Sequence, residues 1–269
     1  MKQLILAAVV AAGLAACATQ AHSDDALKAA IASKDRTPAN VTRDAARHPY
    51  ETLSFFGIKP TMTVVELSPG GGWYTEILAP YLRDKGTYIA GGESPSSANP
   101  GAKRAADNFT KRLEGKPEMY GKVQRGVFEV STGSFNIAPA GSADMVLTFR
   151  NLHNWMGAGD EKLTAIFKGV HTALKPGGVF GVVDHRLPAA RPADLKSGYL
   201  HEAAVIKLIE ANGFKLAAKS EVNANPKDTA DYEKGVWTLP PVLANKEVDR
   251  EKYMAIGESD RMTLKFVKK

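Results

Sequence analysis

An α/β fold with a doubly wound, mostly parallel sheet is predicted by this sequence from three observations. Apolar, β-branched runs of strand length alternate along the chain with amphipathic runs of helix length. The segment from Thr61 to Leu82 contains a strand, a glycine-rich loop and a helix in direct succession. A content of 44% hydrophobic and 24% charged residues in a chain of 269 is ordinary for a globular protein. We therefore expect one central sheet with helices on both faces.

Seven strands are expected, each from a run rich in β-branched or other apolar residues. Val64 and Val65 mark the first, and the continuous apolar run from Val179 to Val183 marks the fifth. The expected strands are residues 63–67, 87–90, 127–130, 143–149, 179–183, 215–221 and 262–267. Because helical segments separate most of these strands, the sheet is expected to be largely parallel.

The helices follow from apolar positions spaced three or four residues apart. The clearest is 160–174, where Leu163, Phe167 and Val170 share one face, and Asn212-Gly213 is a typical C-terminal cap. The expected helices are residues 42–47, 51–56, 73–82, 102–113, 160–174 and 200–211. Residues 223–257, charged and interrupted by prolines, are expected to form a long connection. This connection is either a lid over the active edge or an insertion packed on the surface.

The first residues predict export. Met1-Lys2-Gln3 is a short basic start, and the apolar run 4–16 is too short to span a bilayer permanently, so it is typical of a secretory signal. Leu14-Ala15-Ala16-Cys17 resembles a bacterial lipobox, in which the cysteine becomes the acylated N-terminus. Cys17 is the only cysteine of the chain, and a free cysteine behind a simple signal peptide is the alternative.

An acylated Cys17 predicts the membrane as a partner through a lipid anchor, since each buried methylene contributes about 0.8 kcal/mol. With Ala18 after the cysteine, the resemblance implies a periplasm-facing lipoprotein of the bacterial outer membrane. The expected organisation is a signal peptide at 1–16, a tether at 17–41 and one domain at 42–269.

The charge of the chain does not indicate a nucleic-acid partner. The formal net charge is +6, and the basic residues are scattered rather than gathered in one patch. A solvated helical face explains them most simply, and an anionic membrane surface would also suit them.

The loop after the first strand holds three consecutive glycines, Gly70, Gly71 and Gly72. Without a side chain, glycine lets a nucleotide-like ligand come close to the backbone. A dinucleotide fingerprint requires a small last residue in G-x-G-x-x-G, but Thr75 occupies that position. The loop therefore disfavours a nicotinamide oxidoreductase, and Glu66, four residues before Gly70, indicates another cofactor class.

The pattern of Glu66 followed by the glycines resembles motif I of class I S-adenosylmethionine-dependent methyltransferases. Residues 143–147 resemble the fourth strand of that family, and residues 174–178 resemble its turn before the fifth. The resemblance covers about 51–269 and implies a Rossmann-like sheet of seven strands with an antiparallel last strand. Within the superfamily, the stretches ELSPGGGWY and RN-x-HNW resemble predicted bacterial exported methyltransferases.

This resemblance implies S-adenosylmethionine as cofactor and assigns roles residue by residue. Glu66 would orient the ammonium group of the methionine end. Glu93 is the candidate acid for the ribose hydroxyls, although Gly92 can take the aligned position. Ser68 stands where the family often has another glycine. The implied cofactor-binding residues are Glu66, Ser68, Gly70, Gly71, Gly72 and Glu93. For the adenine amine, Glu129, Ser131 and Thr132 are nearby, and none matches convincingly.

The polar residues after the fourth strand are the candidates for chemistry. Methyl transfer depends chiefly on in-line positioning, and a base is needed only where the acceptor must lose a proton. Arg150 could hold an anionic acceptor, Asn151 could position it, and His153 could act as base because its ordinary pKa is about 6.5. The alternative is that His153 and Trp155 only cap the strand and cover the cofactor.

Asp184 and His185 end the fifth strand at the same edge and could form an acid–base pair. Neighbouring strand residues face opposite sides, so both can enter one pocket only if the strand bends. A polar strand end is the alternative. His153, His185 and His201 make a metal site conceivable, but no ligand spacing supports one, and we expect none.

Two functions follow from these observations. The first is S-adenosylmethionine-dependent methyl transfer to a small or lipid-like acceptor. The second is a non-catalytic binding or envelope-interaction module on a retained methyltransferase fold. The second gains weight from export, since this cofactor is made in the cytoplasm. Binding of the cofactor discriminates between them.

Overall fold

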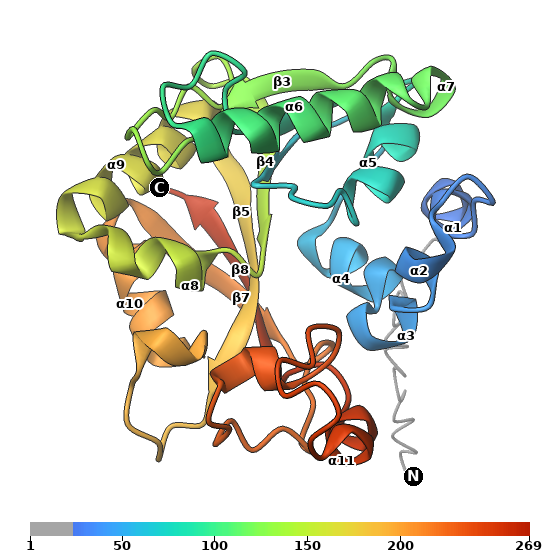
Figure 1. Cartoon of the computed structure of the whole chain (residues 1–269). Coiled ribbons are helices and arrows are strands. Elements are labelled where there is room, and N and C mark those ends of the chain that lie inside the picture. Colours follow the sequence, from blue (N-terminus) through green and yellow to red (C-terminus); the bar gives the residue numbers. More distant parts are fainter. Residues whose placement is uncertain (1–23) are drawn as a thin grey trace, which may run out of the picture.

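A computed structural model of the protein describes residues 24–269, which surround one twisted sheet (Figure 1). Its strands are β1 (Thr63–Leu67), β2 (Thr87–Gly92), β3 (Gln124–Val127), β4 (Ala143–Phe149), β5 (Leu174–Leu187), β6 (Leu200–His201), β7 (Phe214–Ser220) and β8 (Arg261–Lys268). Their order is β3-β2-β1-β4-β5-β8-β7, with β6 paired to β5 beside this path. β8 runs antiparallel to β5 and β7, and the other pairs are parallel. The predicted mostly parallel α/β sheet with an antiparallel last strand is confirmed.

The helices cover both faces of this sheet. They are α1 (Asp25–Ile31), α2 (Pro38–Val41), α3 (Asp44–Arg47), α4 (Pro49–Phe56), α5 (Thr75–Leu82), α6 (Pro100–Glu114), α7 (Pro117–Tyr120), α8 (Leu152–Trp155), α9 (Asp160–Ala173), α10 (Glu202–Ala211) and α11 (Arg250–Ile256). Short 3₁₀ helices are η1 (Met156–Ala158), η2 (Leu195–Ser197) and η3 (Gly235–Thr238). Side chains of α8, α9 and α10 build the apolar core on one face, and side chains of α1, α4, α5, α6 and α7 build the core on the other.

The strands supply side chains to both cores because successive residues point to opposite faces. In β1, Val65 and Leu67 join the core under α9, and Val64 joins the core under α5. Glu66 is 3% exposed and lies on the same face as Val64, as its hydrogen bond to Thr75 of α5 shows. The two-residue period therefore places a carboxylate inside the α5 side of the fold.

Most elements have bounds that differ from the expected ones by one to five residues, and the differences at β3, β5 and α10 have identifiable causes. β3 begins and ends three residues earlier than expected, because it is an edge strand whose exposed Gln124 and Arg125 conceal it in the sequence. β5 extends from Leu174 through the expected Pro-Gly-Gly turn, which the ladder with β4 accommodates by a register shift. An eighth strand among the described residues, β6, replaces the expected start of the helix at residue 200, and α10 begins at Glu202.

Residues 24–41 depart from the predicted tether, because they pack onto the domain. Leu27 of α1 is fully buried, and Asp24 accepts a hydrogen bond from the Tyr81 hydroxyl of α5. The Thr37 hydroxyl donates to Glu76 over 2.6 Å, and the Asn40 carbonyl accepts from the Trp73 indole over 2.9 Å. A short run rich in alanine looks like a linker in the sequence, but specific polar contacts and one buried leucine hold it in place.

The long connection at 223–257 is packed and reaches the active edge. The Tyr199 hydroxyl donates to the buried Asp228 carboxylate, and Val236 of η3 packs on Tyr199 and Leu187. Trp237 is 37% exposed, and its ring centroid lies 6.3 Å from that of His153. This segment is therefore an insertion with its own contacts, and its movement as a lid stays a prediction.

Within residues 24–269 no helix is long and apolar enough to span a membrane. The predicted signal segment and Cys17 lie outside the described residues.

Candidate functional site

The candidate site lies where the strand order reverses, between β1 and β4. Both strands are parallel, so Ser68 after β1 and Arg150 after β4 emerge at the same edge of the sheet. Ligands of doubly wound sheets bind in the crevice outside these carboxyl ends. Ser68 and Arg150 have positive φ angles of 49° and 60°, which is uncommon for residues with a side chain. The chain thus turns sharply at both strand ends and leaves room between them.

The glycine loop supplies that room in two ways. Gly70 has a φ of 53° and Gly72 a φ of 76°, the left-handed region that favours glycine. A Cβ atom added at Gly71 would meet no heavy atom within 4 Å, so this backbone faces open space. A Cβ atom at Gly72 would instead meet the Arg112 side chain at 3.1 Å. Gly70 and Gly71 therefore line the site, and Gly72 shapes the turn behind it.

A hollow of about 460 Å³ lies between this loop and α6. Its walls include five residues that the sequence analysis selected, which are Ser68, Gly70, Gly71, Glu93 and Asn151. Phe109 and Ala106 of α6 provide an apolar side. This is the size and mixed lining of a small-molecule site.

Glu93 is the most informative residue of this hollow. Its Oε2 atom is buried and has no hydrogen-bond partner in the structure. Burial and the nearby Glu129 carboxylate raise the pKa of Glu93 above its ordinary value. A buried acceptor atom without a donor is costly unless a ligand supplies one. A ligand that donates a hydrogen bond in this hollow would satisfy it.

Glu129, considered for the adenine amine, is engaged within the protein. Its carboxylate accepts from the Ser97 hydroxyl over 2.5 Å, from the Ser131 hydroxyl over 3.3 Å and from the Ser94 backbone N–H over 3.3 Å. Burial raises the pKa of Glu129, but these hydrogen bonds together lower it by more, so the pKa lies below its ordinary value. Glu129 thus anchors the loop after β2, and the adenine contact stays unassigned.

Glu66 lines a second, smaller pocket beyond the glycine loop, of about 210 Å³. Its Oε2 atom accepts from the Tyr88 hydroxyl over 2.5 Å and from the Thr75 hydroxyl over 3.1 Å. Burial raises the pKa of Glu66 to about 7, against these hydrogen bonds and the Arg150 charge, which lower it. A cation that binds beside this carboxyl group would therefore favour its ionised form near pH 7.

The second pocket shares Ser68, Gly70, Gly71 and Asn151 with the larger hollow, so the two are contiguous. The Asn151 amide donates to the carbonyls of Leu67 and Ser68 over 3.2 and 3.3 Å, which ties the end of β4 to that of β1. Arg150 lines the second pocket, and its role toward an acceptor stays a prediction.

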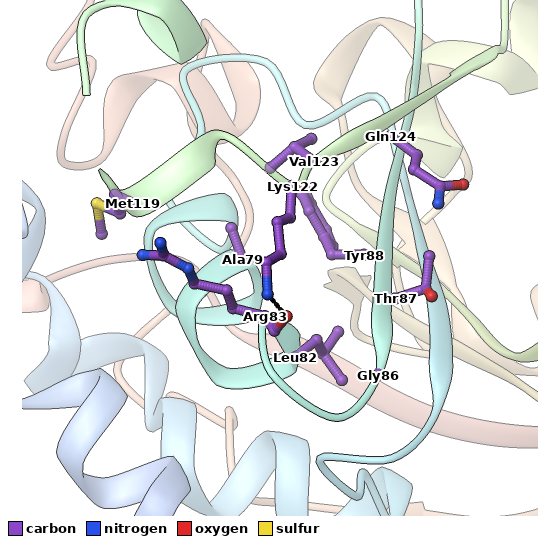
Figure 2. Close-up of a pocket in the computed structure, with 10 residues that line it drawn as sticks. All are labelled: Ala79, Leu82, Arg83, Gly86, Thr87, Tyr88, Met119, Lys122, Val123 and Gln124. Carbon is purple, nitrogen blue, oxygen red and sulfur yellow. Dashed lines mark hydrogen bonds between the residues drawn. The ribbon is translucent and has the colours of Figure 1, made fainter. Parts of the chain in front are cut away.

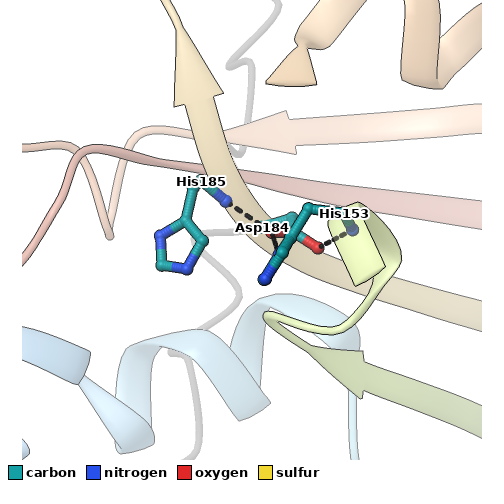
Figure 3. A group of neighbouring side chains, drawn as sticks. All are labelled: His153, Asp184 and His185. Atoms are coloured by element: carbon teal, nitrogen blue, oxygen red, sulfur yellow. Dashed lines mark hydrogen bonds and ion pairs between the residues drawn. The ribbon is translucent and has the colours of Figure 1, made fainter. Parts of the chain in front are cut away.

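His153, Asp184 and His185 form a separate cluster next to these pockets (Figure 3). His153 Nδ1 lies 2.8 Å from Asp184 Oδ1, and the His153 backbone N–H donates to Asp184 Oδ2. His185 Nδ1 lies 2.5 Å from the Ser259 hydroxyl. None of the three lines either pocket, so the role of His153 as a base stays a prediction.

Asp184 and His185 bring polar atoms close together without sharing either pocket, so the strand argument against a common pocket stays a prediction. One polar atom from each of the three residues lies within 4.8 Å of the others, and His201 is not among them. The carboxylate of Asp184 folds back along the strand and accepts the backbone N–H of His185 over 2.8 Å. A short acidic side chain can therefore reach both sides of its own strand.

Two histidines and a carboxylate also suit a metal ion, but their surroundings do not. Burial, followed by the charges of His153, Arg150, Arg261 and Arg47, lowers the pKa of His185 well below its ordinary value. A divalent cation would add to this positive field, and we assign none to the cluster.

Several residues that shape the site gave no signal in the sequence. Arg43 and Arg47 come from the α3 region. Tyr88 holds Glu66 from the neighbouring strand. Only their positions in the folded chain connect them to the glycine loop, so no motif or spacing could have selected them.

A further hollow of about 340 Å³ lies at the opposite edge, at the start of β2 (Figure 2). Gly86 and Thr87 line it, and Lys122 crosses it to donate to the Arg83 carbonyl over 3.1 Å. It contains none of the candidate residues and lies away from the carboxyl ends of the strands.

The comparisons with known proteins agree on the fold. The chain matches no protein-family model, and no curated protein is significantly similar to it. Among solved structures, a SAM dependent methyltransferase from Aquifex aeolicus is similar with a TM-score of 0.55 and 16% identity, over 85% of this chain and 93% of that one. The glycopeptide N-methyltransferase MtfA, solved with sinefungin, has a TM-score of 0.51 and 15% identity, over 84% and 93%.

The [4+2]-cyclase SpnF is similar at the same level, with a TM-score of 0.53 and 15% identity over 87% of this chain and 84% of that one. The protein therefore has the class I methyltransferase fold. The reaction must be argued from its site, because one fold carries different chemistries.

Proposed function

We propose that this protein binds S-adenosylmethionine in the hollow beside the glycine loop and transfers its methyl group to an acceptor in the adjoining pocket. The observation that carries the proposal is the Glu93 Oε2 atom, buried without a partner, on a residue that lines the same hollow as the glycine backbone of Gly70 and Gly71. The similarity to methyltransferase structures, one of them solved with sinefungin, supports it.

The residues present fit the cofactor. Glu93 would accept hydrogen bonds from the ribose hydroxyls, and Gly70 and Gly71 leave space for close approach of the ligand. Glu66, held by Tyr88 and Thr75, would face the ammonium group. When bound, S-adenosylmethionine supplies an electrophilic methyl group on a sulfonium centre.

The contribution of the chain to the reaction is mainly positioning. Asn151 fixes the wall between the two pockets, and Arg150 holds the acceptor beside it. His153, oriented by Asp184, lines neither pocket, so it would take a proton only from an acceptor that extends beyond the second pocket.

Calorimetry of the purified protein with S-adenosylmethionine and S-adenosylhomocysteine tests this proposal. We expect dissociation constants in the micromolar range, and about a tenfold or greater loss of affinity for Glu93→Ala, because the hydrogen bonds to a carboxylate are removed. Lys168→Met, on the exposed face of α9, is the control and should bind as the natural protein does. A folded protein that binds neither ligand would support the non-catalytic envelope module instead.

We also propose that the protein is a lipoprotein facing the periplasm, anchored through Cys17. The support is the sequence pattern at residues 14–17. A Cys17→Ser variant should move from the membrane fraction to the soluble fraction of expressing bacteria. Retention of that variant in the membrane fraction excludes the lipid anchor.

A further inference from the structure

Four arginine side chains gather beside the candidate cofactor hollow. Arg43 and Arg47 come from the α3 region, Arg150 follows β4, and Arg261 begins β8. Among the described residues one carboxylate, Glu258, pairs with three of them: it lies 2.6 Å from Arg43, 3.4 Å from Arg47 and 3.3 Å from Arg261. The Glu66 carboxyl lines the same pocket, and Asp260 acts on Arg261 but is itself paired with Arg186. The four arginines therefore still exceed the acids around them.

Two of these guanidinium groups are not fully satisfied. Arg47 is 2% exposed, and its buried Nη1 atom has no hydrogen-bond partner. The Arg150 side chain is half-buried and makes no hydrogen bond within residues 24–269, so its donors are free to meet a ligand in the pocket that it lines. Arg261, by contrast, donates to the carbonyls of Ala46 and Ser259. Arg47 and Arg150, and Arg43 beyond its Nε bond to Glu258, therefore have guanidinium donors to spare.

Both unsatisfied arginines line the 210 Å³ pocket beyond the glycine loop, together with Arg43. Burial and the Arg150 charge lower the pKa of Arg47 to about 8, and burial and the Arg261 charge lower that of Arg150 to about 10. The crowding of like charges at low solvent exposure is unfavourable, and an anion between them would offset it.

This pocket opens beside the cofactor hollow, because Ser68, Gly70 and Asn151 line both. A group held by Arg47 and Arg150 would therefore lie next to the methionine end of a bound cofactor. Guanidinium groups are suited to carboxylate and phosphate groups, which accept two parallel hydrogen bonds.

We propose that Arg47 and Arg150, with Arg43, form an anion subsite that binds a carboxylate or phosphate group of the methyl acceptor. The inference rests on the proposed methyl transfer for its biological meaning, but the anion site can be measured without it. The cofactor's own carboxylate is the other source of this chemistry. We assign the subsite to the acceptor because S-adenosylmethionine carries an ammonium and a sulfonium besides its carboxylate, a net charge of +1. Its binding adds to the positive excess instead of neutralising it.

The test is thermal unfolding of the purified full chain in increasing inorganic phosphate, compared with sodium chloride at equal ionic strength. We expect a saturable rise of the melting temperature with phosphate that chloride does not produce. Arg150→Met should weaken the apparent phosphate affinity about tenfold or more, and Arg47→Met should do the same. Lys168→Met removes one exposed positive charge elsewhere and should leave the affinity unchanged. If Arg47→Met does not fold, Arg150→Met decides, since its side chain makes no hydrogen bond that folding requires.

The source of the anion is decided by adding S-adenosylhomocysteine at saturation. If the subsite belongs to the acceptor, phosphate still raises the melting temperature of the complex with S-adenosylhomocysteine. If the subsite binds the cofactor's carboxylate, that rise is lost. In the second case the arginine variants would bind S-adenosylhomocysteine more weakly but would bind 5′-methylthioadenosine, which lacks the carboxylate, as the natural protein does. That result would overturn the assignment of the subsite to the acceptor. A phosphate response equal to that of chloride overturns the subsite itself. Absence of S-adenosylhomocysteine binding with a phosphate response intact rejects the proposed function and leaves the anion site standing.

Discussion

Replacing Asp44 with alanine is expected to lower the free energy of unfolding by about 3–5 kcal/mol. The Arg36 side chain is fully buried and donates to the two Asp44 oxygens over 2.6 and 2.8 Å, and to the Ile31 carbonyl over 2.7 Å. Among the described residues Asp44 is its only ion-pair partner, and the Nε atom of Arg36 already lacks a hydrogen bond. Without Asp44 a buried guanidinium remains without a counter-charge.

The reverse substitution, Arg36→Met, is expected to cost less, about 1–3 kcal/mol. The Asp44 side chain is 22% exposed, so water can replace part of what it loses, and methionine keeps contact with the Trp73 ring, which lies 5.2 Å from the guanidinium. Chemical denaturation of both variants measures the asymmetry. Asp107→Ala, which breaks an exposed pair with Lys103, is the control and should change stability by no more than about 0.5 kcal/mol. A larger cost for Arg36→Met than for Asp44→Ala would contradict this account of the N-terminal contacts.

The second large effect is a pH dependence of stability that arises from Glu66. Burial raises its pKa from 4.5 to about 7 in the folded protein. Between pH 4.5 and 7 the folded state thus binds this proton more tightly than the unfolded state does, so stability falls as the pH rises. A shift of this size corresponds to about 3 kcal/mol, present below pH 4.5 and lost by about pH 7.

Glu66→Gln removes the titrating group, so its stability relative to the natural protein should increase by about 3 kcal/mol between pH 4.5 and 8. Denaturation curves of both proteins across this range provide the measurement, with the exposed Glu114→Gln as a control that should follow the natural protein. Parallel pH profiles for the natural protein and Glu66→Gln would show that this carboxyl is already ionised in the fold.

The same pKa couples ligand binding to proton release. A cofactor ammonium beside Glu66 favours the ionised carboxylate, so binding near pH 7 should release part of a proton. Calorimetry in two buffers of different ionisation enthalpy detects this release, and Glu66→Gln should abolish it. Proton release that depends on Glu66 would indicate that the cofactor's ammonium group lies beside this residue, as the sequence resemblance implies.

Local pattern was sufficient for the elements that build the edge of the sheet. β1 and β4 have the predicted bounds, because the apolar and β-branched residues that indicate each strand are consecutive in the sequence. The glycine loop was equally visible, since its backbone requires residues without a side chain at Gly70 and Gly72. The edge strand β3 was displaced in the prediction because its outward side chains are polar.

The sequence by itself determined the α/β sheet, the glycine loop and the carboxylates Glu66 and Glu93, because each depends on residues close together in the chain. Only the tertiary structure decided that residues 24–41 pack onto the domain, that Asp184 orients His153, and that Arg47 and Arg150 share a pocket. Arg43 donates a hydrogen bond to Glu258, which is 215 residues away in the sequence, and no periodic pattern predicts a contact over such a separation. Contacts of this kind arise when distant segments bury their surfaces together, and here they place several arginine side chains in the pocket beside the glycine loop.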